Sequence, residues 1–276
     1  MKNLKMTGWV LVLVLLVTKS YAQSDSNEQL TVPLSSPGKP YTLKVQLIQG
    51  SIKVVSYEGK DVIINVSNPD GKDNGESEKS TKDGMRRISS SGSYEVTAKE
   101  SDNTITVNSN NPMKTLDLSL KIPQDVKLKA GTINGGDIEV ENVKGELEVS
   151  NVNGEIKLTN VSGSVVANTV NGDVTATFLS VDPKAPMAFS TLNGDVRVTL
   201  PADTKANLKL KSDNGEIYSD FDIDIDKTQP KTSKTNEPGM YKIKRDGWVQ
   251  GKINGGGPEM LMKNMQGDIY VKKGGK

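Results

Sequence analysis

The chain has 276 residues, with 35 Lys or Arg against 34 Asp or Glu, so no excess of positive charge points to nucleic acid or to an anionic surface. Aromatic residues make up 4% of the chain, too few for the stacking platforms that bind single-stranded nucleic acid. Histidine and cysteine are absent, which excludes Ser-His-Asp and Cys-His catalytic sites, zinc held by His or Cys, haem and iron–sulfur centres.

The first 22 residues have the pattern of a secretory signal peptide. Lys2 and Lys5 give a positive start, residues 9–17 are apolar, and small residues precede a predicted cut between Ala22 and Gln23. The apolar run is too short to span a membrane comfortably, and no later run approaches the required length, so we expect no membrane span in the mature chain. The protein is therefore predicted to be exported, to the periplasm or to the extracellular cell surface.

Strand patterns begin after a polar N-terminal segment, residues 23–40. Residues 68–93 are rich in Gly, Ser, Lys, Asp and Glu, which predicts a long exposed loop. On either side of that loop, runs rich in aliphatic residues predict strands at 43–47, 50–54, 62–66, 94–98, 104–107 and 116–122. We assign residues 41–276 to one β domain.

A short repeat dominates the second half of the chain. Glycines recur every nine residues at Gly136, Gly145, Gly154, Gly163 and Gly172. Asn-Gly pairs, which tolerate the positive φ of a sharp corner, are separated by 18 to 22 residues, at Asn134-Gly135, Asn153-Gly154, Asn171-Gly172, Asn193-Gly194 and Asn214-Gly215. A fixed short period is typical of stacked copies of one unit. We therefore predict an all-β fold, a β-helix with coils of roughly 18–22 residues and these pairs as its structural corners.

An antiparallel β meander or sandwich is the alternative fold, because Asn-Gly between alternating runs also favours β-hairpins. The fixed period favours the coil, since a meander does not require one. In the coil, alternation predicts these inward positions: Leu147, Val149, Ile156, Leu158, Val165, Ala167, Val174, Ala176, Val196 and Val198.

Two further patterns complete the chain. Ile122-Pro123 and Leu200-Pro201 each place proline directly after a strand, which predicts one kind of corner used twice. Residues 219–241 are a second predicted loop. The repeat returns at 253–257 and 266–271, which we predict to be the last coils, with residues 260–262 covering an open end that another copy of the chain could pair with.

Acidic residues follow the corner glycines. The predicted column contains Asp137, Glu155, Asp173, Asp195 and Glu216, stacked about 4.8 Å apart. Such a column suggests a calcium-binding edge, because hard cations favour carboxylate oxygens. The alternative is a hydrated column offset by Lys157 and Arg197, and the absence of the full Gly-Gly-x-Gly-x-Asp calcium pattern favours it. The acidic series 220–226 has the same two interpretations, a cation or basic partner against a solvated strand face.

Catalysis is not predicted. Stacked-coil folds do host glycoside hydrolases and polysaccharide lyases, whose chemistry needs only carboxylates or a basic residue. No carboxylate pair stands apart from the repeat column, and Trp248 is the only tryptophan after the signal segment that could line a sugar groove. We therefore assign no catalytic residue, no cofactor other than the calcium alternative, and no enzyme activity.

These phrases resemble a known bacterial family. The resemblance is carried by residues 50–54, Ile122-Pro123, the Gly-acid-aliphatic phrases from Gly136 to Val174, and residues 192–196 leading into Leu200-Pro201. The chain is similar to the bacterial "putative adhesin" domain of unknown function, related to GIN-type autotransporter adhesin head domains. That resemblance implies a right-handed single-stranded β-helix, a cell-envelope or exported location, and no catalytic residues to transfer.

The predicted function is that of an exported, non-catalytic cell-envelope protein, an adhesin or a structural or binding module that presents an elongated β surface. Its expected partners are envelope polysaccharide or another envelope protein, and not nucleic acid. Two alternatives are a carbohydrate-active enzyme built on a β-helix and an envelope sensor or accessory protein, because fold alone does not fix function.

Overall fold

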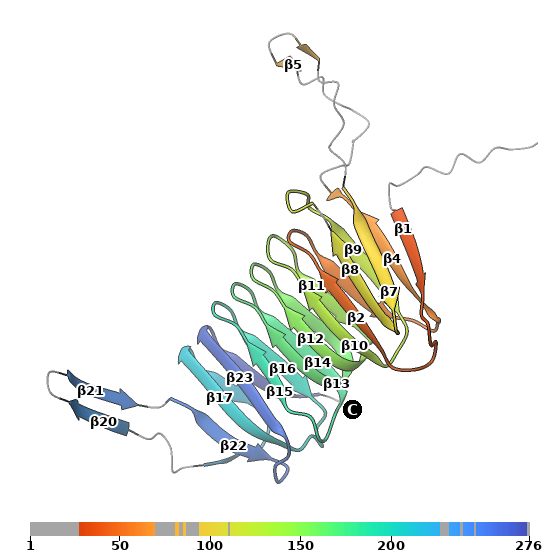
Figure 1. Cartoon of the computed structure of the whole chain (residues 1–276). Coiled ribbons are helices and arrows are strands. Elements are labelled where there is room, and N and C mark those ends of the chain that lie inside the picture. The colour runs from red at the N-terminus through yellow and green to blue at the C-terminus, as the bar shows by residue number, and fades with distance from the viewer. Residues whose placement is uncertain are drawn as a thin grey trace, which may run out of the picture.

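The computed structural model describes residues 28–69, 81–82, 85–86, 94–109, 111–226, 232–237, 240–245 and 247–274. Every regular element among them is a β-strand, stacked as successive coils along one axis (Figure 1). Within these ranges there is no helix with the length and apolarity needed to cross a membrane. The predicted signal peptide, residues 1–22, lies outside the described residues, as does most of the predicted loop 68–93, where only the two-residue strands β5 (Thr81–Lys82) and β6 (Met85–Arg86) are described.

Two parallel ladders of strands form the body of the fold, and each coil gives one strand to each ladder. In spatial order, the first ladder contains β8 (Thr104–Ser109), β2 (Tyr41–Gln46), β10 (Val126–Gly131), β12 (Lys144–Ser150), the second half of β13 (Ile156–Asn168), β15 (Met187–Ser190), β23 (Glu259–Gln266) and β17 (Ala206–Asn214). The second ladder contains β9 (Asp117–Ile122), β3 (Ile52–Ser56), β11 (Ile138–Glu141), the first half of β13, β14 (Val174–Val181), β16 (Val196–Leu200), β24 (Ile269–Lys273) and β18 (Ile217–Ser219). The repeat therefore builds a β-helix-like solenoid in which residues one coil apart are vertical neighbours.

Within the large sheet of the solenoid, antiparallel pairing among the described strands is confined to its two ends. At one end β7 (Val96–Ser101) covers β8, and β4 (Asp61–Ser67) covers β9 and pairs with β1 (Glu28–Pro33). At the other end β22 (Val249–Ile253) covers β17 and pairs with β19 (Asp224–Ile225). The meander alternative is therefore wrong for the repeat. Strand β1 also lies before Tyr41, where the sequence pattern predicted only a polar segment.

The order of the coils in space differs from their order in the chain. The coil of β23 and β24 lies between the coil of β15 and β16 and the coil of β17 and β18, as its pairing on both sides shows (Figure 1). Met260 and Met262 are consequently buried in the core. The prediction that the chain's final coil, with residues 260–262, covers an open end is therefore wrong. The terminal coil at that end is the one formed by β17 and β18.

Both proline corners step across an inserted coil. The segment after Ile122 leads from β9 to β10, on either side of the coil of β2 and β3, and the segment after Leu200 leads from β16 to β17, on either side of the coil of β23 and β24. In each case the inserted coil ends by donating a backbone N–H to the residue before proline, from Tyr57 to Ile122 and from Gly274 to Leu200. The prediction of one corner used twice is confirmed.

The core lies between the two ladders and is filled by the inward side chains of every coil. Along β12 the pattern of buried and solvated positions alternates, with Leu147 and Val149 inward. All ten predicted inward residues are almost completely buried. Phe178 and Phe189 pack edge to face, with ring centroids 6.2 Å apart. Because both ladders turn polar residues outward, the solenoid offers two solvated sheet faces and two edges for binding.

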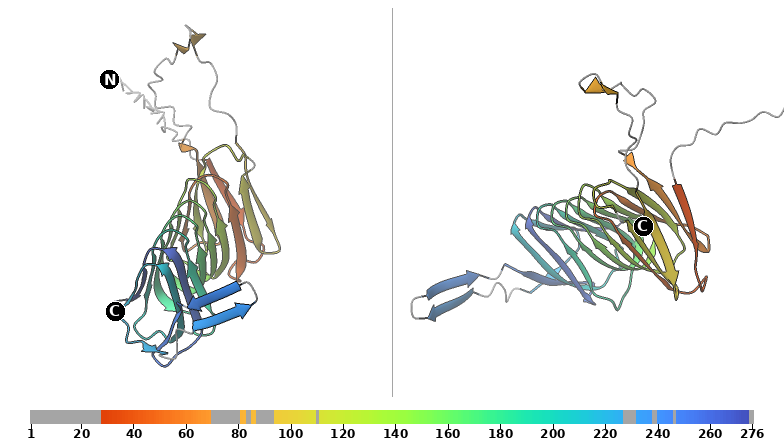
Figure 2. Two further views of the ribbon diagram at one scale, coloured as in Figure 1. Left: turned by 90° about the vertical axis from the view of Figure 1, so that its left-hand side faces the viewer. Right: turned by 45° about the horizontal axis from the view of Figure 1, so that its top comes forward.

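The predicted loop 219–241 contains more regular structure than its composition suggested. It includes β19, β20 (Thr232–Glu237) and the first residues of β21 (Met240–Arg245), and the last two strands form an antiparallel hairpin. Figures 1 and 2 show this hairpin projecting from the end of the stack that carries β22.

Corner glycines permit the coils to stack closely. Gly172 has a φ of 145°, and a Cβ added there would overlap the backbone carbonyl of Gly154 in the neighbouring coil. Gly135 also has positive φ, 64°, but its added Cβ would meet open space. In that corner the additional residue Gly136 takes the stacked position, against the carbonyl of Gly50.

Replacing Gly172 by alanine should lower the free energy of unfolding by about 3 kcal/mol, because it combines an unfavourable φ with a clash against fixed backbone. The matched variant Gly135→Ala should lose only about 1–2 kcal/mol, the cost of positive φ alone. Urea denaturation followed by circular dichroism measures both. Equal losses would show that the close approach of the coils does not limit stability.

Candidate functional site

A five-residue pattern forms the corners that lead from the first ladder to the second from β10 onward, and the preceding corner at 47–51 departs from it at Leu47 and Ser51. The pattern consists of a buried polar residue, an aliphatic residue, an amide, a glycine and an acid, and is complete at 151–155, 169–173, 191–195 and 264–268. The corner at 132–137 has one additional glycine, and the corner at 212–216 carries Asp213 in the aliphatic position. Because the coils are in register, each position of the pattern forms its own row along the edge of the solenoid.

The first position ties neighbouring coils together. A buried hydroxyl or amide donates to the carbonyl oxygen of the corner glycine in the adjacent coil, as from Thr169 to Gly154 over 3.0 Å and from Thr191 to Gly172 over 2.8 Å. The same bond is made by Thr132, Asn151, Ser212 and Asn264. Without this bond the glycine carbonyl oxygens would have no hydrogen-bond donor at the corner. A buried polar group that lacks a partner is costly.

The predicted corner asparagines form an amide row. Asn153 donates to Asn134 over 3.3 Å, Asn171 to Asn153 over 2.8 Å, and Asn193 to Asn171 over 2.7 Å. Asn214 does not continue the row, because Gln266, in the coil of β23 and β24, lies beside Asn193. Asn214 donates instead to the carbonyl oxygen of Met265.

The acidic residues act as acceptors for the next coil. Asp137 accepts the backbone N–H of Glu155, Asp173 that of Asp195, and Asp195 that of Asp268, at 2.7–2.8 Å. Asp268 accepts the N–H of Glu216 over 2.9 Å. Asp268 is therefore a member of the column that sequence analysis missed, because the inserted coil places it between Asp195 and Glu216.

A cationic and aromatic stack neutralises part of this column. Arg197 contacts Asp195 at 2.5 Å and Asp173 at 3.6 Å, and its guanidinium lies 4.6 Å from the ring centroid of Tyr270. Tyr270 stacks on Tyr218 and donates its hydroxyl to Asp268. The N–H of Glu216 and this hydroxyl lower the pKa of the Asp268 carboxyl, and the bond to Asp268 raises the pKa of Tyr270.

No group of three or more acidic side chains in the described part of the chain is arranged to hold a metal ion. In the column, the oxygens of Asp137, Asp173 and Asp195 accept backbone N–H groups, and Arg197 supplies positive charge. This geometry is consistent with the cation-compensated interpretation, and the calcium alternative stays a prediction. Lys157, the other predicted cation, lies on the outward face of β13, beside Glu139 and Thr175 in the ladder.

The acidic series 220–226 does not lie on one strand face. Only Asp224 lies in a strand, the two-residue β19, while Asp220 accepts the backbone N–H of Lys273 over 2.6 Å. The predicted alternation fails because residues 220–223 do not form a strand and Ile225, which should face inward, is 49% exposed. Trp248 lies beside the outer face of β17, with Lys209 and Lys211 at 5.0 and 5.9 Å from its ring centroid.

The corner ridge is a second feature that sequence analysis missed. It consists of the aliphatic residues at the second corner position, Ile48, Ile133, Val152, Val170, Leu192 and Met265. Five of them are 37–46% exposed, and Val152 is half-buried. The signal was present in the sequence as an apolar residue before the corner amide in every one of these turns except 212–216, outside the alternating pattern of the strands.

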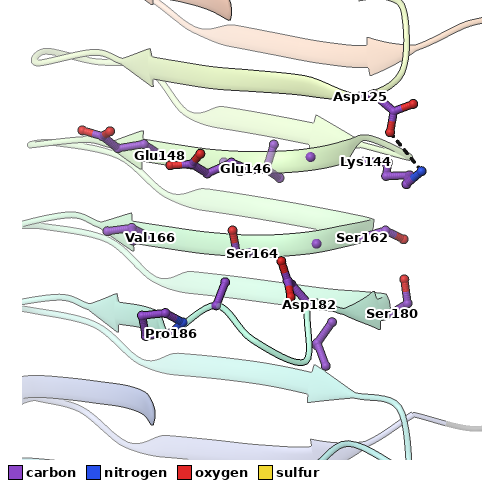
Figure 3. Close-up of a pocket in the computed structure, with 15 residues that line it drawn as sticks. Asp125, Lys144, Glu146, Glu148, Ser162, Ser164, Val166, Ser180, Asp182 and Pro186 are labelled. Atoms are coloured by element: carbon purple, nitrogen blue, oxygen red, sulfur yellow. Dashed lines mark ion pairs between the residues drawn. The ribbon is translucent and has the colours of Figure 1, made fainter. Parts of the chain in front are cut away.

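A groove lies on the outer face of the first ladder, with a volume of about 730 Å³. It arises because the long side chains of Glu146 and Glu148 on β12 give way to Ser164 and Val166 on β13, and because the loop 182–186 turns outward beside them (Figure 3). The lining also includes the polar residues Ser162 and Ser180 and the apolar residues Ala185 and Pro186.

The carboxylates of the groove carry compensating charges. Asp125 pairs with Lys144 at 2.9 Å, as Figure 3 shows, while Lys127 pairs with Glu146 at 3.0 Å and Lys129 with Glu148 at 2.5 Å. Asp182 accepts the backbone N–H of Lys184 over 2.8 Å. The groove is thus nearly neutral, with hydroxyl and carboxylate oxygens beside small apolar side chains.

Comparison with known proteins gives one family match and several matches to solved structures. The family model described as Toastrack DUF4097 matches residues 112–254. A crystal structure of a "putative cell adhesion protein" from Clostridium sporogenes is 12% identical, with a TM-score of 0.40, and covers 90% of this chain and 100% of that chain. A "putative adhesin" from Bacteroides fragilis is 10% identical, with a TM-score of 0.38, and covers 91% of this chain and 98% of that chain. No curated protein matches the chain.

Replacing Asp195 by alanine should lower the free energy of unfolding by about 1–2 kcal/mol, because the N–H of Asp268 and the guanidinium of Arg197 both lose an acceptor. Glu155→Ala is the matched control, since the Glu155 carboxylate has no hydrogen bond or ion pair to any residue in the described ranges. Chemical denaturation measures both variants, and an Asp195 loss no larger than the control's would contradict the structural role.

Excess EDTA should leave the melting temperature of the purified protein unchanged, and added calcium should not raise it, because the acidic column already has N–H donors and a cation. Differential scanning calorimetry with and without calcium tests this expectation. A rise in melting temperature that saturates with calcium and disappears with EDTA would restore the calcium edge.

Proposed function

The chain belongs to the Toastrack DUF4097 family, whose model spans more than half of its residues, and we propose that it is an exported, non-catalytic binding module of the cell envelope. Its solenoid presents an elongated β surface. The groove on the first ladder is the part of that surface that binds a ligand in this proposal.

The near-neutral groove is the observation that carries the proposal. A concave site that combines a few polar groups with apolar side chains is the usual form of a ligand site. Three of its carboxylates form ion pairs with lysines. Their oxygens are thereby held in position as hydrogen-bond acceptors, and their negative charge is compensated. Ser162, Ser164 and Ser180 add hydroxyls that both donate and accept.

This chemistry suits a neutral, polyhydroxylated polymer. Sugar hydroxyls would donate to Glu146 and Glu148 and exchange hydrogen bonds with the serines, while the C–H faces of the rings would pack on Val166 and Pro186. An envelope polysaccharide supplies such a ligand as an extended chain, which the open ends of a groove along the ladder can accommodate.

Binding without catalysis is favoured over a carbohydrate-active enzyme. Glycoside hydrolysis needs a proton donor and a second carboxylate that acts as base or nucleophile. In the groove the carboxylates of Asp125, Glu146 and Glu148 each form an ion pair with a lysine, so their oxygens are already engaged within the protein.

Three finer expectations belong to the same proposal. Residues 1–22 support export, through their positive start and apolar run. We expect the single chain to wind its coils in a right-handed sense, because about 98% of parallel strand connections have that hand. The Gly-acid-aliphatic phrases support a relation to GIN-type adhesin head domains.

Ser164→Trp should fill the groove and weaken polysaccharide binding by about tenfold or more, equivalent to roughly 1.4 kcal/mol. The chain without its first 22 residues is immobilised and tested against a panel of envelope polysaccharides and peptidoglycan fragments. Lys157→Trp, on the outer face of the second ladder, is the control and should bind as the parent does.

Two results would contradict the proposal. Unchanged binding by Ser164→Trp, or retention of no polysaccharide at all, would remove the groove as a glycan site. New reducing ends or unsaturated products in the incubated samples would show that the protein is an enzyme.

A further inference from the structure

The corner ridge has the properties of a contact surface. Its six side chains lie one per coil in consecutive coils, and backbone hydrogen bonds hold them in register, from Asn153 to the carbonyl of Ile133 and from Asn171 to that of Val152. Successive side chains are therefore about 4.8 Å apart, and the ridge is roughly 24 Å long. Contiguous exposed apolar surface of this kind marks interaction sites in soluble proteins.

The rows that flank the ridge are almost free of charge. On one side lies the amide row, Asn134, Asn153, Asn171 and Asn193, with Gln49 beyond one end of it and Gln266 beyond the other. On the other side lie the last outward residues of the first ladder, Gln46, Gly131, Ser150, Asn168, Ser190 and Lys263. Charges are concentrated elsewhere, on the sheet faces and in the acidic column. The corner ridge and its two flanking rows form one strip. With almost no charge, this strip does not complement a strongly charged partner and does not repel the same strip on a second copy of the chain.

We propose that the corner ridge is the interface of a homodimer in which two copies of this chain pack edge to edge, with their solenoid axes antiparallel. A second copy is the partner whose side chains repeat with the same spacing, so every aliphatic residue of one ridge can pack between those of the other. The surface is self-complementary, as a two-fold interface requires. The proposal concerns a different surface from the groove and does not depend on it.

Charge at one end of the strip selects the antiparallel arrangement. Lys263 borders the ridge at Met265, whereas Asp213, in the aliphatic position of the coil beyond it, is paired with Lys211 at 2.7 Å. A parallel dimer would place Lys263 of one copy beside Lys263 of the other, and like charges directly opposite are unfavourable. The antiparallel dimer separates them to opposite ends. It places Ile48 opposite Met265 of the second copy, and Val152 opposite Val170.

The size of the strip indicates a dimer of moderate affinity. Three rows of six residues approach the roughly 20–30 residues per partner of a standard interface. We therefore expect dissociation in the micromolar range, since interfaces of this size reach higher affinity only with strong central contacts.

Sedimentation velocity across the micromolar range is the first test. The chain without its first 22 residues should pass from monomer to dimer, and Val170→Glu should weaken dimerisation by at least about tenfold, because it buries a charge at the centre of the interface. Val166→Glu is the matched control. Val166 lies in the same coil and is 42% exposed against 37% for Val170, but it faces the groove, so this variant should dimerise normally.

Cross-linking tests the arrangement, and the absence of natural cysteine gives a clean background. A mixture of Ile48→Cys and Met265→Cys should be joined by a short bis-maleimide, and either variant alone should not. Cross-linking of Ile48→Cys with itself would overturn the antiparallel arrangement. A parent chain that stays monomeric at every concentration, or equal effects of Val170→Glu and Val166→Glu in folded proteins, would overturn the interface itself.

Discussion

The corner edge of this solenoid depends on one hydrogen bond, donated by a buried hydroxyl or amide to the glycine carbonyl of the neighbouring coil. At a corner the backbone leaves the ladder, so its carbonyl loses the partner that a strand would provide. A side chain such as Thr169 replaces that partner from within the coil. The bond can form only because the corner glycine of the donor's own coil, Gly172 in this case, has no Cβ to overlap that carbonyl, which lets the two coils approach. The polar residue and the glycine are thus two parts of one requirement, and register follows from satisfying it in every coil.

Register in turn decides which surfaces the molecule can offer. With each corner position confined to its own row, the acids lie where they accept N–H groups of the next coil, the amides bond to one another, and the aliphatic residues have no place in the core. The sheet faces differ for the same reason. The first ladder becomes hollow where Ser164 and Val166 follow two glutamates, while the second ladder brings Arg197, Tyr270 and Tyr218 together in a stack. Binding surfaces here result from rows of side chains more than from individual loops.

The sequence predicted what depends on local pattern. The period of the glycines and the Asn-Gly pairs predicted stacked coils, and alternation predicted inward residues such as Leu147 and Ile156. It could not predict the position of the coil that contains Met260, because its neighbours are chosen by long-range pairing that leaves no local mark. The role of Asp268 and the end of the amide row at Asn193 were missed for that reason. The groove was also out of reach, since it depends on how side chains from β12 and β13 combine with a loop from the next coil.

The position of the coil of β23 and β24 has a consequence for how the protein is made. A ribosome delivers residues 206–219 well before residues 259–273, yet the later segment must occupy the space between the earlier one and residues 187–200. Winding during translation therefore cannot simply proceed from one coil to the next at this end. Until residues 259–273 have been made, the coil of β17 and β18 has two options. It can stay two strand spacings away from the coil of β15 and β16, spanned by residues 201–205, or it can remain detached from the stack. The interleaved order thus makes completion of the stack a late event, after the polypeptide between the two coils has left the exit tunnel.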